Sequence, residues 1–539
     1  MRAQKSAKNI IVALISNALN IVLGVVVQSI FLKTLGEEYL GLNTVLTSIL
    51  SMLSIAELGL GSAIIYNMYK PIANKDKEKI KSLMKFYKKC YSIIIIVMLA
   101  IGLIVSIFLK QIVGETQTIQ NLYLLYFLFL TDVIFSYTIA YKRSIIYANQ
   151  EEYLTNIVHL IYLVVMNGLQ ILFLYLTHNY CVFLIIKLVC RILENVLVNI
   201  IANKKYPYIN EKDVKELDKE IKDDIIKNIK ALFFHKIAGF IVSSTDTILI
   251  SVFFEGLVTV AYYSNYNLVL SAITTILNQF LLSATASIGD LLTENNKERN
   301  YEIYKKLNFL NFVIFIIGAT GMACAIEPFI TIFFGEQYIL SKFILISLIL
   351  KFFIQGMRRP LMAFKEAAGI FYVDRFVPIL ESVVNLVASI ILLKICGLAG
   401  IFLGTAVSSL VILLYSYPKY VYRPLFNKKW KDYYIEFIKT ILYATIIVGI
   451  TMGVNQLIRV SNIFAEQVLS VVVAIIIPVI IITLVSGRTE EYKYYINIIK
   501  NILFRKKEVK QWLMKKMDKQ EKQKVEKDIK KSKKVKKEK

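Results

Sequence analysis

Histidine and cysteine are scarce in this sequence of 539 residues, which contains three of the first and five of the second. The histidines, His159, His178 and His235, form no H-E-x-x-H motif and no Ser/His/Asp grouping, so the common zinc-hydrolase and serine-hydrolase centres are excluded. The cysteines, at positions 90, 181, 190, 324 and 396, are scattered with no C-x-x-C spacing. We therefore expect neither a metal site nor a disulfide framework.

A phosphate-binding loop is also missing, and charged residues are few. No G-x-x-x-x-G-K-S/T motif occurs, so we expect no nucleotide hydrolysis by this chain, no enzymatic activity and no cofactor. Only 19% of the residues are charged, whereas 56% are hydrophobic and the mean hydropathy is +0.58. This composition excludes a soluble globular protein and indicates a protein that crosses the membrane many times.

Apolar segments of the length that spans a bilayer, about 20 residues, recur along the whole chain. We predict an all-α membrane protein with about fourteen transmembrane helices. Their approximate ranges are 9–32, 40–67, 90–109, 121–141, 153–177, 180–202, 229–254, 258–288, 307–326, 341–364, 376–395, 397–418, 434–457 and 464–486.

Lysine and arginine alternate between the segments that connect these spans. They are concentrated at the N-terminus, at 70–89, 142–143, 204–236, 297–306, 358–359 and 419–431, and in the tail, while turns such as 36–39, 177–179 and 255–256 carry almost none. Because positively charged loops are retained in the cytoplasm, both termini are expected to be cytoplasmic in a multi-pass protein of the cell membrane. The outward loops are all short, which argues against a membrane polymerase or glycosyltransferase.

The tail from about residue 488 is rich in lysine and carries about half of the net charge of +25. Attraction to anionic lipid headgroups is the expected role of such a tail, at about 1 kcal/mol for each cation near the membrane surface. The tail lacks interleaved aromatic residues, so we expect no nucleic-acid partner.

The two halves of the chain resemble one another at an offset of about 220 residues, as in transporters built from duplicated units. The tripeptide Lys-Asn-Ile opens the first span at residue 8 and the seventh at residue 227. We expect two parallel six-helix repeats with two extra C-terminal helices. The predicted parts are an N-lobe at 1–208, a cytoplasmic linker at 209–228, a C-lobe at 229–425, the last two helices at 426–487 and the basic tail at 488–539.

Ionisable groups at membrane depth are the candidate functional residues, because each of them is costly there. Glu57 and Asp246 lie mid-span in the second and seventh helices, where an acid has no anchoring role, and we predict cation coupling or cargo contact for them. Arg191 is equally compatible with a structural ion pair to Glu194, three residues further along the same helix. The arginines at 143, 358 and 359 are equally compatible with anchors at the membrane surface.

Several stretches resemble the oligosaccharide flippases of the multidrug, oligosaccharidyl-lipid and polysaccharide exporter superfamily. They are LGLGSAI at 58–64, STD at 244–246, YSNY at 263–266, and the stretch from Arg359 through 367–371 to Arg375, with Glu381 and Asn385 beyond. The likeness covers nearly the whole chain up to the fourteenth span.

The resemblance implies a V-shaped carrier whose two lobes open alternately to the two sides of the membrane. Its cargo would be an undecaprenyl-pyrophosphate-linked oligosaccharide for a surface polysaccharide, with a polysaccharide polymerase and glycosyltransferases as candidate partners. A pyrophosphate needs cations and sugar hydroxyls need amides. The candidate residues are Arg143, Lys187, Arg191, Lys236, Arg358 and Arg359 for the pyrophosphate, Asn43, Asn265, Asn267 and Asn278 for the sugar, and Glu57, Asp246 and Glu381 for cation coupling.

Two other carriers of the same superfamily remain open. A peptidoglycan-precursor flippase would share the layout and a cationic cavity, and would differ only in its cargo. A cation-coupled multidrug exporter would favour an acidic and aromatic cavity instead. A structural membrane scaffold is disfavoured, because it has no need of acids in mid-membrane.

Overall fold

The computed structural model is helical throughout the part of the chain that it describes. This part comprises residues 2–53, 57, 60–114, 119–211, 214–254, 256–294, 296–370, 373–458 and 460–501. The predicted all-α class is confirmed. Nine helices in this part are individually long and apolar enough to cross a membrane.

The N-lobe is the bundle formed by α1 to α9, and each of the first six predicted spans contains helix in its described residues. Its helices are α1 (Arg2–Leu35), α2 (Glu37–Leu53), α3 (Leu60–Ala73), α4 (Lys77–Ile107), α5 (Leu109–Val113), α6 (Leu122–Tyr137), α7 (Ala140–Ala148), α8 (Glu152–Thr177) and α9 (Tyr180–Lys205). A short 3-10 turn, η2 (Pro207–Asn210), leads out of the lobe.

The C-lobe is the bundle formed by α10 to α17, and α18 and α19 follow it. These helices are α10 (Lys219–Phe253), α11 (Leu257–Thr293), α12 (Lys297–Phe333), η3 (Glu336–Tyr338), α13 (Lys342–Met357), α14 (Arg359–Ala367), α15 (Val377–Cys396), α16 (Leu398–Val411), the π-helical turns η4 (Ile412–Ser416) and η5 (Pro418–Tyr422), α17 (Arg423–Phe426), α18 (Trp430–Gln456) and α19 (Ile463–Ser486). Helix α10 begins inside the segment predicted as a linker.

The duplication predicted from the sequence is visible in where the helices begin and end. Lys77 and Lys297, which open α4 and α12, are 220 positions apart, and Thr177 and Cys396, which close α8 and α15, are 219 apart. The fourth and tenth spans, predicted as single helices, are each interrupted at matching places, between α6 and α7 and between α13 and α14. In the second case Pro360 follows directly, and a proline ring that lacks an N–H favours a new helix start over continuation of the old helix.

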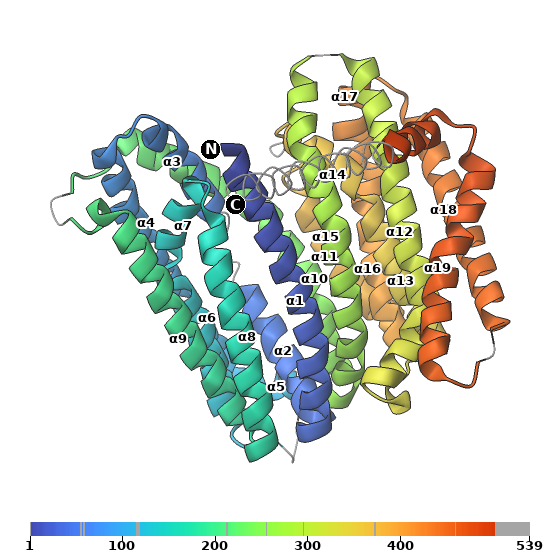
Figure 1. Ribbon diagram of the computed structural model, residues 1–539, viewed down its shortest axis with the longest axis horizontal. Helices are drawn as coiled ribbons and strands as arrows, with labels where there is room; N and C mark the ends of the chain where they lie inside the picture. The colour runs from blue at the N-terminus through green and yellow to red at the C-terminus, as the bar shows by residue number, and fades with distance from the viewer. Residues whose placement is uncertain are drawn as a thin grey trace, which may run out of the picture.

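The two lobes pack together at one end of the bundle and diverge toward the end that carries the start of α1 (Figure 1). At the closed end α2 of the N-lobe lies against α10 and α11 of the C-lobe. A Cβ atom on Gly41 of α2 would lie only 1.9 Å from the carbonyl oxygen of Leu257, so only glycine permits this approach. Gln28 of α1 donates to Asn265 Oδ1 of α11 at 2.7 Å, and Ser29 donates to the carbonyl of Phe333.

Helices α18 and α19 lie on the outer flank of the C-lobe, drawn in orange and red in Figure 1. Both contact α12. Thr320 of α12 donates to the carbonyl of Ala474 at 2.7 Å. Large apolar side chains point outward from helices all round the molecule, among them Leu172 of α8, Leu193 of α9 and Ile476 of α19. Such a surface suits contact with lipid, as the sequence predicted.

Candidate functional site

A cavity of about 520 Å³ opens within the C-lobe and contains four of the predicted site residues. These four are Asn267, Arg358, Arg359 and Glu381. The other polar residues that line it are Tyr263, Ser271, Thr274, Thr275, Lys351 and Gln355, and the remainder of the wall is glycine and apolar side chains from α10, α11, α13 and α14. The cavity is therefore the candidate cargo site.

One wall of the cavity is formed by the end of α13 and the start of α14. Lys351 and Gln355, four residues apart on α13, and Arg358, the residue that follows the helix, all line the cavity at helical spacing. Arg359 opens α14 directly after the helix break. The break thus places two adjacent guanidinium groups on the same cavity wall.

Most of these cations have carboxylate partners. Arg358 binds Glu381 of α15 through both terminal nitrogens, with a distance of 3.1 Å from Nη2 to Oε2. Lys351 Nζ lies 2.5 Å from Oδ2 of Asp246 on α10. Arg359 is the cavity-lining cation for which no carboxylate lies within ion-pair distance among the described residues. An anionic ligand could bind Arg359 without displacing a carboxylate of the described residues.

The wall contributed by α11 is polar but uncharged. Asn267, Ser271 and Thr274 follow one another at helical spacing and all line the cavity. The Oδ1 atom of Asn267 accepts a long hydrogen bond of 3.4 Å from the hydroxyl of Tyr263, which leaves its amide nitrogen available. Amides and hydroxyls along one face are the groups that bind sugar hydroxyls.

The N-lobe cations form a separate cluster on α7 and α9. Lys187 and Arg191 both bind Asp132 of α6, at 3.3 Å in each case. Arg191 also binds Glu194 at 2.6 Å, and Arg143 reaches the other oxygen of Glu194 at 3.2 Å. The structural ion pair between Arg191 and Glu194, one of the two alternatives raised by the sequence, is therefore present.

Further groups close the N-lobe cluster around Glu194, whose side chain is fully buried. His159 Nδ1 lies 3.1 Å from the same carboxylate oxygen that Arg143 contacts. The guanidinium of Arg191 stacks over the ring of Tyr162 at 4.6 Å. Three cations thus share two carboxylates, and each cation has at least one acidic partner.

The remaining predicted residues lie apart from both clusters. Asn43 accepts a hydrogen bond of 3.0 Å from Tyr180, and Asn265 binds Gln28 where the lobes meet. Asn278, on α11, is half-buried, and its Oδ1 atom has no hydrogen-bond partner among the described residues. Glu57 lies between α2 and α3 and accepts a hydrogen bond of 3.1 Å from Tyr91. The side chain of Lys236 falls outside the described part of the structure.

Two residues of these clusters, Asp132 and Lys351, were missed by the sequence analysis. Both lie inside apolar runs, at mid-length of the fourth and tenth predicted spans, so the signal was a single charge in a hydrophobic segment. They are 219 positions apart, the same offset that relates the ends of α8 and α15. The duplicated scaffold therefore carries an acid at one copy of this position and a base at the other.

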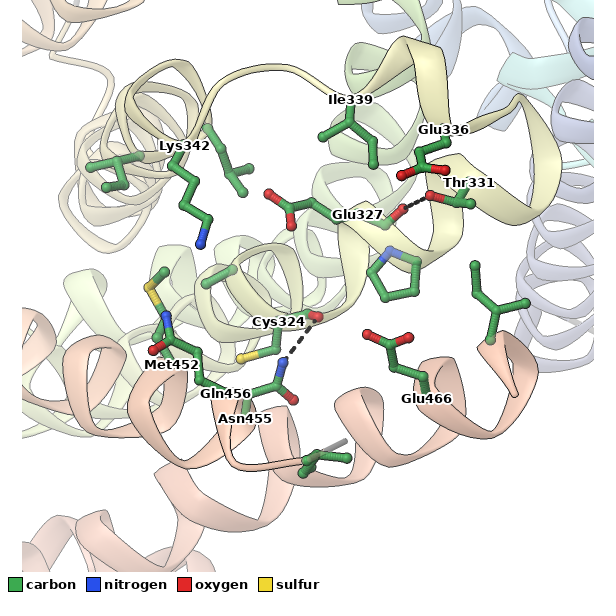
Figure 2. Close-up of a pocket in the computed structure, with 16 residues that line it drawn as sticks. Cys324, Glu327, Thr331, Glu336, Ile339, Lys342, Met452, Asn455, Gln456 and Glu466 are labelled. Carbon is green, nitrogen blue, oxygen red and sulfur yellow. Dashed lines mark hydrogen bonds between the residues drawn. The ribbon is translucent and has the colours of Figure 1, made fainter. Parts of the chain in front are cut away.

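A second cavity, of about 490 Å³, lies where α12 and α13 meet α18 and α19, at the end of the bundle away from Arg2. Figure 2 shows the carboxylates of Glu327, Glu336 and Glu466 around it, with Lys342 at one side. Pro328 cannot donate to the carbonyl of residue 324 within α12, and the amide of Asn455 donates to that carbonyl instead, at 3.4 Å (Figure 2). This cavity contains none of the predicted cargo residues, and its acidic lining is opposite in sign to the first.

Comparisons with known proteins agree with this architecture. The sequence matches no family model and no curated protein. Among solved structures, the lipid II flippase MurJ in an inward closed conformation is similar, with 16% identity and a TM-score of 0.65, over 91% of this chain and 99% of that one.

Two MATE transporters show the same likeness. An inward-facing MATE transporter of the MOP superfamily has 15% identity and a TM-score of 0.58, over 73% of this chain and 91% of that one. A variant of the Vibrio cholerae MATE transporter VcmN has 14% identity and a TM-score of 0.55, over 76% and 94%. At these identities the likeness concerns the fold, and the chain has the fold that MurJ and the MATE transporters share.

Proposed function

We propose that this protein is an alternating-access flippase that moves an undecaprenyl-pyrophosphate-linked oligosaccharide across the cell membrane for surface polysaccharide synthesis. The observation that carries the proposal is the C-lobe cavity, in which a cationic wall on α13 and α14 shares one space with an amide and hydroxyl wall on α11. A pyrophosphate-linked sugar presents those two chemistries side by side.

The charge of the cavity favours an anionic cargo over a cationic one. Lys351, Arg358 and Arg359 line it, and Glu381 is the acid among its lining residues. Asp246 lies behind Lys351 and does not line the cavity. A cationic drug would gain no carboxylate that is not already bound to an arginine or a lysine, whereas a phosphate gains Arg359 directly.

The volume of the cavity suits a head group. About 520 Å³ lies within the range of about 300–1,000 Å³ that is typical of small-ligand sites. A pyrophosphate with its first sugars fits such a space, and a long prenyl chain does not. The lipid tail then stays in the bilayer beside the protein, between the lobes.

A peptidoglycan-precursor flippase is the second candidate, because the solved structure with a TM-score of 0.65 is a lipid II flippase. Such a flippase is also expected to have a cationic cavity, so the same wall on α13 and α14 would serve its cargo. The two candidates differ in the sugars that must face Asn267, Ser271 and Thr274.

Orientation in the membrane follows from the same proposal. The start of α1 and the end of α19 lie at the same end of the bundle, where the lobes diverge (Figure 1). If the basic connectors fix this end in the cytoplasm, the structure is open toward the side on which lipid-linked sugars are made. The basic tail would then meet the anionic lipids of the inner leaflet.

The test is translocation of a fluorescent undecaprenyl-pyrophosphate oligosaccharide in proteoliposomes. Parallel vesicles contain a fluorescent lipid II analogue or a cationic dye as cargo. Transport of the oligosaccharide lipid supports the proposal, transport of lipid II alone moves the protein to the second candidate, and dye export without lipid movement overturns both.

A further inference from the structure

Asp246 is a fully buried carboxylate whose two oxygens already have close partners. Oδ1 accepts a hydrogen bond of 2.7 Å from the hydroxyl of Thr405 on α16, and Oδ2 contacts Lys351 Nζ at 2.5 Å. Asn385 of α15 donates to the Thr405 oxygen at 2.9 Å and holds that hydroxyl in place. An ion pair of this kind requires both partners, because an isolated buried carboxylate is strongly unfavourable.

Lys351 connects this buried carboxylate to the cavity. Its side chain is 16% exposed, whereas that of Asp246 is 1% exposed, and Lys351 lines the cavity while Asp246 lies behind it. The rings of Tyr263 and Phe402 flank the ammonium at 6.0 and 5.6 Å. An ammonium has three N–H donors, and Asp246 accepts one of them, so donors remain for a ligand in the cavity.

The position of the Lys351 ammonium is the one that a bound metal cation would need. A metal ion at Asp246 would have to sit against the carboxylate and gather several oxygen ligands. The ammonium already occupies Oδ2, and within the described residues no group of three or more acidic, histidine or cysteine side chains is placed to hold a metal. The cation expected at Asp246 is therefore supplied by the chain itself.

We propose that Lys351 is the resident counter-ion of Asp246, which takes the place of a coupling metal ion there and offers its remaining donors to the anionic head group of the cargo. Asp246 is then a positioning residue that also competes with the cargo for the lysine. The part that concerns the cargo rests on the proposed function, and the part that concerns the metal ion does not.

The first experiment addresses the metal ion and needs no cargo. The melting temperature of the full-length protein in detergent is measured in sodium chloride and in choline chloride at equal ionic strength. We expect the two values to agree within about one degree, because Lys351 fills the site. A rise in sodium that disappears in the Asp246→Asn variant would overturn the proposal.

The second experiment uses farnesyl pyrophosphate as the probe, with farnesol as its uncharged control. Asp246→Asn should bind the probe about tenfold more tightly than the wild type, because the lysine is released from its competitor. Adding Lys351→Gln to Asp246→Asn should weaken binding about tenfold or more, and Lys351→Arg alone should retain it. Asp246→Asn leaves Lys351 unpaired whereas the double variant leaves no buried unpaired charge, so the melting temperatures of the two variants show whether lost stability contributes to the difference in binding.

If Lys351 binds the head group, removing Asp246 should strengthen probe binding and removing Lys351 should weaken it. A purely structural ion pair would instead lose probe binding in both cases. If Asp246→Asn weakens probe binding, Lys351 merely holds the helices together and the proposal is wrong. If the wild type does not bind the probe at all while sodium still has no effect on its melting temperature, the proposed anionic cargo fails and the assignment of Lys351 as counter-ion stands.

Discussion

In the N-lobe, Arg143, Lys187 and Arg191 are all bound to the carboxylates of Asp132 and Glu194, whereas in the C-lobe Arg359 lines a cavity with no carboxylate within ion-pair distance among the described residues. The two clusters share the equivalent helices α6 and α13, and α7 and α14, while α9 completes the first and α10 and α11 complete the second. The difference teaches that a cation at membrane depth is informative about function only once its partners are known.

The largest effect is expected in the N-lobe cluster. Arg191→Gln removes a cation that binds both Asp132 and Glu194, and it should lower the free energy of unfolding by about 3 kcal/mol, because each buried carboxylate loses one of its cationic partners and keeps another. Thermal unfolding in detergent measures this loss. Lys187→Gln is the matched control, with one contact to Asp132, and should cost clearly less. Equal and small losses would show that the cluster does not stabilise the lobe.

The corresponding change in the C-lobe should affect transport instead of stability. Arg359→Gln removes an arginine that has no acidic partner to strand, and it should slow translocation of the lipid-linked oligosaccharide about tenfold to a hundredfold, equivalent to a charge-assisted hydrogen bond of about 1.5–3 kcal/mol. Its melting temperature should stay near that of the wild type.

Lys394→Gln serves as the control for Arg359, because Lys394 is an exposed cation at the end of α15 and does not line the cavity. It should transport at the rate of the wild type. Unchanged transport by Arg359→Gln would remove the distinction between the two lobes.

Substitutions at the contact between the lobes should have smaller effects on stability. Asn265→Ala removes the hydrogen bond to Gln28, and it should lower the free energy of unfolding by about 1–2 kcal/mol, since both amides are at least partly buried. Asn267→Ala, two residues further along α11 and in the cavity, should leave stability unchanged and weaken cargo binding severalfold. Melting curves and binding titrations of the two variants test this difference. If both variants change stability and binding alike, the separate roles of Asn265 and Asn267 are wrong.

The smallest effect is expected on the outer flank. Asn455→Ala removes the donor to the carbonyl of Cys324 beside Pro328, and it should destabilise the packing of α18 on α12 by about 1 kcal/mol. Gln456→Ala, at the exposed neighbouring position, is the control for general helix effects. Chemical unfolding of both variants measures the difference in the free energy of unfolding. The two variants should be equally stable if another donor binds the carbonyl of Cys324.

The fold could be predicted from the sequence because it depends on the length of the apolar segments and on the spacing of the internal repeat. Each predicted span contains helix in its described residues, with the fourth and tenth spans divided in two, and the offset between the halves matched the ends of α8 and α15. Interruption of the tenth span was foreseeable from Pro360. That of the fourth span has no proline, so local sequence offered no equivalent signal.

The candidate site was less accessible to sequence reasoning, since it depends on which charges meet across helices. The pairing of Arg191 with Glu194 was one of two alternatives that the sequence offered, but its contact with Asp132, 59 residues earlier, was not visible along the chain. Asn265 and Asn267 are two residues apart, yet one binds the opposite lobe and the other lines the cavity. The predicted roles of all the candidate residues stay predictions, for Arg358, Arg359, Asn265, Asn267, Asp246 and Glu381 as much as for Arg143, Lys187, Arg191, Lys236, Asn43, Asn278 and Glu57.

The close approach of Gly41 to Leu257 places the junction of the lobes at one end of long helices. A rotation at this junction therefore displaces the opposite end of each helix by a much larger distance. Helix α1, with 34 residues, is about 50 Å long at 1.5 Å per residue. A rotation of about 10° at the junction would move the far end of α1 by about 9 Å, while Gly41 would hardly move relative to Leu257. A small change of angle where α2 meets α10 and α11 would therefore become a large displacement at the other end of the bundle.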